Sequence, residues 1–186
     1  MSEELLIRHC SPTLAGIKTG NLFACRFPGK AEMRECVRCW NNLLTKKGLR
    51  VLPLRFRNGR ALIYLYRPAR LSEDLRHGTA ERILKERGYC TDTSEKCVVQ
   101  LIRRLCEYEE FPHEIGLFLG YPPEDVRGFI ENCAEHCKLC GYRKVYGDVD
   151  RAAELFVRCK QCTESFCERI HAGLAIGQPV AAMKSS

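Results

Sequence analysis

Apolar residues follow two periods along this chain, and the clearest pattern is a β-hairpin around Asn58-Gly59. Apolar and aromatic runs cover residues 50–57 and 60–67 on either side of this dipeptide, and Asn-Gly between such runs is the strongest short-range sign of a two-residue turn. This turn places Arg57 opposite Arg60 and so predicts the strand register. One face then collects Leu52, Leu54, Phe56, Ala61, Ile63 and Leu65, and the other collects Arg55, Arg57, Arg60, Tyr64 and Tyr66 with Val51, Pro53 and Leu62.

Helical periodicity accounts for most of the remaining chain. Residues 2–9 read as a short helix, and Ser11-Pro12 then combines an N-cap serine with a proline at the first helical position, which predicts a second helix start. Residues 31–47 carry Met33, Val37, Trp40 and Leu44 on one stripe. Further helices are predicted over residues 79–87, 94–108 and 150–171, the last capped by Asp150, and further strands over 22–27 and 141–146.

Because the strands do not alternate regularly with helices, the pattern indicates an α+β fold rather than a doubly wound one. We expect a small, mainly antiparallel sheet packed against several helices, with a helical C-terminal half. Its strands should lie near residues 22–27, 50–57, 60–67 and 141–146. Residues 1–172 should form a single domain, and residues 173–186 a flexible tail.

The segment FPHEIGLFLGYPPEDVRGFI, residues 111–130, predicts two short helices joined at Gly120 and the Pro122-Pro123 pair. Its apolar spacing resembles a helix-turn-helix skeleton. The second helix carries Glu124, Asp125 and Glu131 against a single arginine, which is the wrong charge for a helix that reads the DNA major groove. Nucleic acid is therefore the less favoured partner, and we single out His113 and Glu114 in the first turn as candidate polar groups of a pocket.

The net charge of +7 is concentrated in the first part of the chain. Residues 1–70 hold 14 Lys and Arg against 4 Asp and Glu, a balance of +10, whereas residues 71–186 hold 16 against 19, a balance of −3. This asymmetry favours an anionic small molecule or an acidic protein as partner, with the face of Arg55, Arg57, Arg60, Tyr64 and Tyr66 as candidate binding surface. The chain has neither a membrane-spanning apolar run nor a signal peptide, so we expect a cytoplasmic protein with no membrane partner.

Thirteen cysteines are an odd number in a chain without an export signal, which favours reduced thiols or metal ligands over disulfides. The most metal-like spacing is Cys133-x3-Cys137-x2-Cys140 together with Cys159-x2-Cys162. Such thiolates could hold zinc or an iron–sulfur cluster. The same five residues also fall on apolar stripes of helices predicted after Pro123 and over 150–171, so core packing is the competing interpretation.

Cys10 is the candidate reactive thiol. It follows His9, precedes the helix start predicted at Ser11, and has Lys18 nearby; unpaired helix amides and a cation both favour the thiolate form. In this hypothesis His9 or His113 handles protons, Lys18 stabilises negative charge and Asn21 donates to a substrate. A buried structural cysteine is the alternative.

Three segments resemble an uncharacterised family, the domain of unknown function DUF3793 of small proteins from anaerobic Gram-positive bacteria. They are RHCSPTLAGIKTGNLF (residues 8–23), FPHEIGLFLGYPPEDVRGFI (111–130) and GYRKVYGDVDRAAELFVRCKQCT (141–163). The resemblance implies no established activity, and Arg143 stands where it leads us to expect an aromatic residue. It directs attention to His9, Cys10, Thr13, Lys18 and Asn21 in the first segment, to Pro112, His113, Glu114, Gly120 and Tyr121 in the second, and to Lys144, Tyr146 and Cys162 in the third.

Three functions stay open at this level. The first is a small thiol-dependent enzyme or redox accessory protein that uses Cys10. The second is a non-enzymatic protein that binds nucleic acid or an acidic protein through the Arg/Tyr hairpin face. The third is a zinc or iron–sulfur protein built on the cysteines of residues 133–162.

Overall fold

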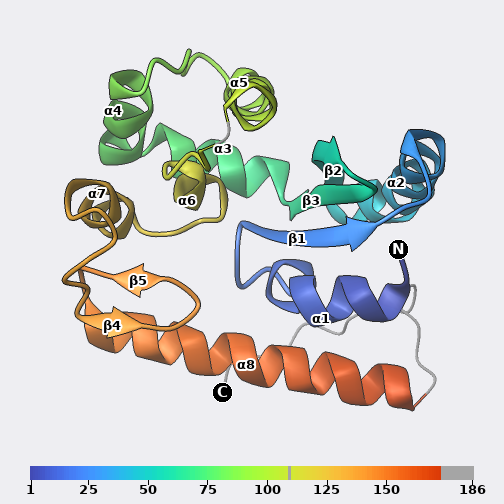
Figure 1. Cartoon of the computed structure of the whole chain (residues 1–186). Coiled ribbons are helices and arrows are strands. Elements are labelled where there is room, and N and C mark those ends of the chain that lie inside the picture. Colours follow the sequence, from blue (N-terminus) through green and yellow to red (C-terminus); the bar gives the residue numbers. More distant parts are fainter. Residues whose placement is uncertain (109, 173–186) are drawn as a thin grey trace.

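A three-stranded antiparallel sheet crosses the middle of the molecule, in the order β1-β3-β2 (Figure 1). The computed structural model describes residues 1–108 and 110–172. The strands are β1 (Gly20–Arg26), β2 (Arg50–Arg57) and β3 (Arg60–Tyr66), and the short β4 (Leu139–Cys140) and β5 (Lys144–Val145) form a separate ribbon. The helices are α1 (Glu3–Leu14), α2 (Lys30–Leu44) with a 3-10 turn (Thr45–Lys47), α3 (Pro68–Arg76), α4 (Gly78–Glu86), α5 (Ser94–Glu107), α6 (Ile115–Phe118), α7 (Pro123–Glu131) and α8 (Val149–His171).

The α+β class is confirmed, and so is the helical C-terminal half. The strand expected over residues 141–146 is short and pairs with β4 rather than joining the main sheet. The flexible tail expected at residues 173–186 lies outside the described residues. Within the described part of the chain, no helix is both long and apolar enough to cross a membrane.

The turn of the predicted hairpin is confirmed, but the strand register farther from the turn differs from the prediction by one residue. Asn58 and Gly59 have positive φ angles of 51° and 70°, as a type I′ turn requires, and Arg57 pairs with Arg60. A bulge between Pro53 and Arg55 then inserts one residue into β2. Beyond the bulge the predicted faces of β2 are exchanged, because one extra residue moves every later side chain to the opposite face.

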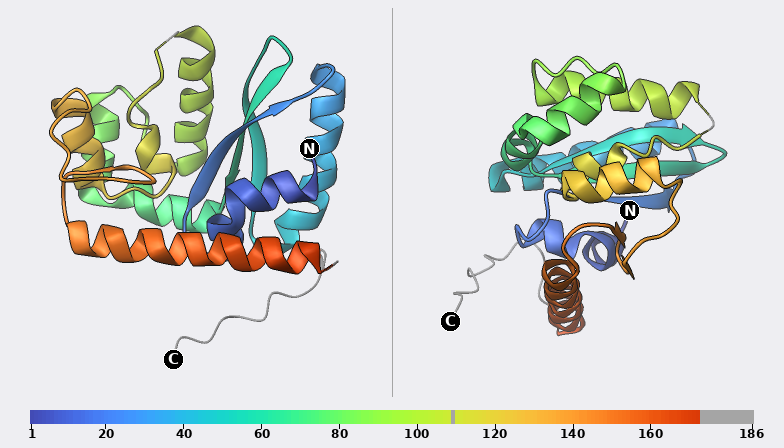
Figure 2. Two further views of the ribbon diagram at one scale, coloured as in Figure 1. Left: turned by 60° about the horizontal axis from the view of Figure 1, so that its bottom comes forward. Right: turned by 90° about the vertical axis from the view of Figure 1, so that its left-hand side faces the viewer.

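Both faces of the sheet are buried. Helices α3 to α7 cover the face that holds Tyr64 and Tyr66, and α1 and α2 cover the face that holds Ile63 and Leu65. Figure 2 shows the sheet between these two groups of helices, with α8 running outside α1. A sheet covered on both sides needs apolar residues on both of its faces, which explains why β3 reads as a nearly continuous apolar run.

Helix α1 is continuous from Glu3 to Leu14, so the second helix start predicted at Ser11-Pro12 is wrong. Ser2 caps the helix by accepting a hydrogen bond from the Leu5 N–H, and Pro12 lies inside the helix. The Ser11 hydroxyl donates instead to the Ile7 carbonyl, one turn back, at 2.5 Å. Burial of one face of α1 against the sheet and α8 outweighs the local preference for an interruption.

The segment of residues 111–130 folds into α6 and α7 around Gly120, whose φ of 73° favours glycine. Helix α7 ends at Glu131, so the cysteine stripe predicted to continue from it is wrong; Cys133 follows in an irregular loop with a φ of 48°. The stripe predicted on α8 is confirmed, with Cys159 and Cys162 buried. Asp148, rather than Asp150, caps α8.

Candidate ligand-binding site

A pocket of about 160 Å³ lies where α6, α7 and the β4–β5 ribbon meet, at the end of the molecule away from α2 (Figure 1). Its walls are mostly apolar and aromatic, and its polar side chains are confined to a few positions. We call it the Tyr121 pocket; its lining residues are Phe111, His113, Ile115, Gly116, Tyr121, Asp125, Val126, Phe129, Arg143 and Lys144. An apolar cavity with a few converging polar groups is the usual form of a small-molecule site.

Local sequence explains why the two helices approach closely enough to form these walls. A side chain at Gly116 would place its Cβ only 2.8 Å from Val126 Cγ2 and 3.1 Å from the Tyr121 ring. Because real Cβ contacts are almost never this short, only glycine allows α6 to pack directly on α7 and Tyr121. The Pro122-Pro123 pair then starts α7.

Asp125 joins α7 to the segment of residues 143–147 at the pocket. Its Oδ1 accepts hydrogen bonds from the backbone N–H groups of Tyr146 at 2.7 Å and Gly147 at 2.9 Å, and its Oδ2 accepts one from Arg143 Nε at 2.7 Å. The side chains of Asp125 and Arg143 are 2% and 7% exposed. A buried ion pair is stable only when further hydrogen bonds satisfy its members, and the two backbone donors meet this need for the carboxylate.

Tyr121 is the point at which three distant parts of the chain meet. The Arg143 guanidinium lies 5.6 Å from the centroid of the Tyr121 ring, and Lys18 Nζ lies 5.1 Å from it. Arg143 also stacks 5.4 Å from the Phe156 ring of α8. These distances are typical of cation–π contacts, so the segments of residues 8–23, 111–130 and 141–163 each contribute to one buried cluster.

The cluster carries more positive than negative charge. Burial lowers the pKa of Lys18 to about 8, with a smaller lowering by Arg143, while Cys159 and Cys10 oppose the change. Within the described residues no hydrogen bond or ion pair reaches Lys18 Nζ, and Asp125 is the carboxylate paired with Arg143. Such an unbalanced buried charge favours an anion nearby.

The remaining candidates of the first segment lie on α1 and β1. Cys10 lies fully buried inside α1, and burial raises the pKa of its thiol far above the usual range. His9 is exposed and stacks on Phe23 with ring centroids 5.3 Å apart; partial burial and then Arg8 lower its pKa. Asn21 Oδ1 accepts a hydrogen bond from the Thr13 hydroxyl at 2.6 Å. The helix start that was expected to activate Cys10 is absent, because α1 continues through this residue.

His113 and Glu114 are adjacent in sequence but point to different environments. His113 lies at the pocket, where its ring meets Phe129 edge-on at 5.1 Å. Glu114 is buried on the other side, where it accepts a hydrogen bond from the Tyr89 hydroxyl at 2.9 Å and lies 3.7 Å from Arg104 Nη1. Glu114 therefore joins the loop before α6 to α5, and His113 is the one of the two that a ligand in the pocket would meet.

The five cysteines considered as metal ligands are divided between different environments. Cys133 and Cys140 are exposed, Cys137 is half-buried, and Cys159 and Cys162 are buried on α8. Among the described residues, no group of three or more His, Cys, Asp or Glu side chains has an arrangement that could hold a metal ion.

The Arg/Tyr hairpin face is also partly buried and partly exposed. Tyr64 and Tyr66 stack on each other with centroids 4.5 Å apart and are buried under the helices that cover this face. Arg55 is half-buried and donates to the Leu105 carbonyl at 3.4 Å, while Arg57 and Arg60 are exposed near the turn. The tyrosines therefore belong to the core, and only the arginine end of this face reaches solvent.

Sequence reasoning did not identify Asp125 and Arg143 as partners. Asp125 has the position of an ordinary acidic residue in the first turn of a helix, and Arg143 lies 18 residues away in an irregular segment. The one available signal was that Arg143 stands where the resemblance predicts an aromatic residue. A buried arginine in place of an aromatic side chain needs a carboxylate, and the tertiary structure supplies Asp125.

Comparison with known proteins identifies a family but no activity. The family model described as "Protein of unknown function (DUF3793)" matches residues 6–178. Searches of curated proteins and of solved structures each found no match.

Proposed function

The chain belongs to the DUF3793 family, whose description names no activity, and we propose from the geometry that it binds a small acidic molecule, about one ring in size, in the Tyr121 pocket. The size follows from the volume: about 160 Å³ is close to the ~150 Å³ of an apolar cavity that accepts benzene. The aromatic and aliphatic walls favour a flat apolar body.

The observation that carries the proposal is the burial and the incomplete hydrogen bonding of the Arg143 side chain. Its guanidinium is almost completely buried at the pocket, and Nε is occupied by Asp125. No described residue accepts a hydrogen bond from its two terminal nitrogens. Because a guanidinium presents these nitrogens as a fork that matches a carboxylate, a carboxylate of a ligand in the pocket would supply the acceptors that the described residues do not provide.

The neighbouring residues support an acidic ligand. Lys144 lines the same pocket and donates to the Ala134 carbonyl, which holds its side chain in place. Lys18 adds positive charge on Tyr121. The carboxylate of Asp125 already accepts three hydrogen bonds, one of them from Arg143, and these donors offset its negative charge.

A matched series of small compounds tests this proposal. Benzoate, benzyl alcohol and acetate separate the requirement for a ring from the requirement for a charge, with binding followed by ligand-observed NMR and by chemical-shift changes in the protein. We expect benzoate to bind more tightly than both other compounds. Equal binding of benzyl alcohol would contradict the role of Arg143, and equal binding of acetate would contradict the role of the apolar walls.

The variant Arg143→Lys keeps the charge but removes the fork, and should weaken benzoate binding by about tenfold or more. Arg158→Lys, the same change on the exposed side of α8, is the control and should bind as the unmodified protein does. Unchanged affinity in Arg143→Lys would show that the ligand does not contact the guanidinium.

A second candidate function rests on a row of arginines at the end of the sheet. In the strand register Arg26 pairs with Arg60, and Arg60 pairs with Arg57, and all three are exposed. Like charges directly opposite each other destabilise a sheet, so the facing pair of Arg26 and Arg60 favours an anionic partner. The hairpin tyrosines are buried and offer no surface for stacking bases, which favours an acidic protein over single-stranded nucleic acid.

Binding of a labelled poly-glutamate chain and of a labelled oligonucleotide, followed by fluorescence anisotropy at low and high salt, tests this second function. Arg26→Glu with Arg60→Glu should abolish poly-glutamate binding, whereas Arg82→Glu with Arg103→Glu, which makes the same charge change on exposed helix surfaces, should leave most of it. Binding that is equally lost in both variants would indicate only a response to net charge.

A further inference from the structure

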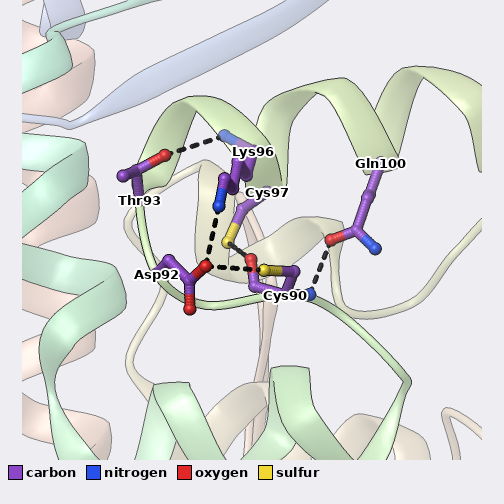
Figure 3. A network of polar contacts seen from close by, with 6 residues as sticks. All are labelled: Cys90, Asp92, Thr93, Lys96, Cys97 and Gln100. Atoms are coloured by element: carbon purple, nitrogen blue, oxygen red, sulfur yellow. Dashed lines mark hydrogen bonds and ion pairs between the residues drawn. The ribbon is translucent and has the colours of Figure 1, made fainter.

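Two cysteines that do not line the Tyr121 pocket lie in direct contact. Cys90 follows α4, and Cys97 lies in the first turns of α5. The Cys97 thiol donates to the Cys90 carbonyl oxygen at 3.3 Å, and the Cys90 thiol donates to Asp92 Oδ2 at 3.2 Å. Figure 3 shows both sulfur atoms at the inner side of the same turn, beside Asp92.

The turn that carries Cys90 is fixed by several hydrogen bonds. The Cys90 N–H donates to Gln100 Oε1 at 2.7 Å, and Lys96 Nζ donates to Asp92 Oδ2 at 2.7 Å (Figure 3). The Thr93 hydroxyl caps α5 by accepting from the Lys96 N–H at 3.2 Å. These contacts hold the two cysteines together in the reduced protein, so little conformational entropy would be lost if a bond formed between them.

The two thiols differ in access and in acidity. Cys90 is exposed, whereas Cys97 is buried. Burial, and then the neighbouring Cys90, raise the pKa of Cys97 to about 11. An outside reagent therefore meets Cys90 first. Cys97 is placed to react only after Cys90 has formed a mixed disulfide.

A polar cavity of about 220 Å³ adjoins the pair. Its walls include Thr91, Asp92, Thr93, Ser94 and Cys97, together with Arg76 and Glu81. Hydroxyl and charged groups of this kind suit a small hydrophilic group rather than an apolar one. The cavity thus provides space beside Cys97 for the substituent of a small polar disulfide.

We propose that Cys90 and Cys97 form a thiol–disulfide exchange site for small polar disulfides. Cys90 loses its proton to water, and its sulfur attacks one sulfur of R–S–S–R. The S–S bond breaks, one R–S⁻ leaves and takes up a proton, and Cys90 carries a mixed disulfide. Cys97 then loses its proton, attacks the Cys90 sulfur and releases the second R–S⁻. Two protein thiols are oxidised to one disulfide, and R–S–S–R is reduced to two R–SH.

The pH dependence of the two steps differs in this scheme. The second step needs the Cys97 thiolate, whose fraction rises about tenfold for each pH unit below its pKa. At neutral pH the mixed disulfide on Cys90 should therefore persist long enough to be trapped, and it should resolve faster as the pH is raised. The Cys90 sulfur has to leave Asp92 to bond with Cys97, which fits an exposed side chain with a single hydrogen bond.

Trypsin offers a direct assay, because it cleaves after Arg87, Lys96 and Arg103. The reduced full-length chain is treated with 2-hydroxyethyl disulfide, free thiols are blocked with an alkylating reagent, and the peptides are analysed by mass spectrometry. The proposed disulfide links residues 88–96 to residues 97–103. We expect this linked pair, preceded by a mixed disulfide on the first peptide.

Variants separate the roles of the two thiols. In Cys97→Ser, or in Cys97→Ala if serine is not tolerated in the core, Cys90 should stay as the mixed disulfide. In Cys90→Ser, Cys97 should stay reduced, and Cys106→Ser, which changes an exposed cysteine of the same helix, should leave the linked pair unchanged. Recovery of Cys90 only as a mixed disulfide while Cys97 stays free, or oxidation of Cys97 in the absence of Cys90, would overturn the proposal.

Discussion

Replacing the buried Lys18 with an apolar side chain of similar length should stabilise the protein. Lys18 is 9% exposed, and burial lowers its pKa from 10.5 to about 8. One pKa unit corresponds to about 1.4 kcal/mol, so the protonated side chain destabilises the fold by about 3 kcal/mol. We therefore expect Lys18→Met to raise the free energy of unfolding by about 2–3 kcal/mol at neutral pH.

The sign of the pH dependence follows from the lowered pKa. Below about pH 8 the lysine is protonated in both states, and the fold bears the full destabilisation. Between about pH 8 and 10.5 the unfolded chain keeps the proton and the folded protein loses it, so the stability of the unmodified protein rises with pH. Above 10.5 both states are neutral and the effect is gone. The difference in the free energy of unfolding between Lys18→Met and the unmodified protein should therefore shrink by about 2 kcal/mol between pH ~7 and pH ~10.

Urea denaturation under reducing conditions, followed by circular dichroism at these two pH values, measures this difference. Lys46→Met, at an exposed position of the 3-10 turn, is the control and should shift stability by less than about 0.5 kcal/mol. A destabilised Lys18→Met at neutral pH, or a difference that stays constant with pH, would refute the account of Lys18 as an uncompensated buried cation.

Three further predictions address packing and access. Gly128→Ala should lower the free energy of unfolding by about 1–3 kcal/mol, because the new Cβ would lie 2.4 Å from the ring of Tyr146, although alanine favours helices. In Gly78→Ala the new Cβ meets nothing within 4 Å, so this control should not destabilise the protein. Tyr89→Phe removes a hydrogen bond to a buried carboxylate and should lower the unfolding free energy by about 1.5–3 kcal/mol, whereas Tyr108→Phe, at an exposed ring, should have little effect. Cys10 should resist alkylation in the folded protein; rapid labelling by a limiting electrophile would contradict its burial.

The features of the fold that were predicted correctly depend on residues that lie close together in the sequence. Asn58-Gly59 has the conformational freedom for a type I′ turn wherever it occurs, so the pairing of Arg57 with Arg60 followed directly. The α2 stripe was equally local, because 3.6-residue periodicity requires no partner to be read. The bulge near Pro53 left no comparable sign, and it exchanged the faces of the distal part of β2.

Errors in the helices came from burial that a linear pattern does not contain. Ser11-Pro12 has every local feature of a helix start, yet α1 continues through it because Leu6, Ile7 and Cys10 are buried together. That continuity also removed the physical basis for an activated Cys10. After α7, the cysteine spacing suited a helix, but the chain turns at Cys133 toward the ribbon.

The sequence by itself determined the α+β class, the hairpin turn, most helices and the segments that contribute to the Tyr121 pocket. It could do so because these features depend on periodicity, turn residues and short motifs. Only the tertiary structure decided that Lys18, Tyr121 and Arg143 meet, that Asp125 binds Arg143, and that Cys90 and Cys97 lie in contact. These are contacts between residues separated by turns or by long stretches of chain, and packing of the helices on the sheet and on one another brings them together.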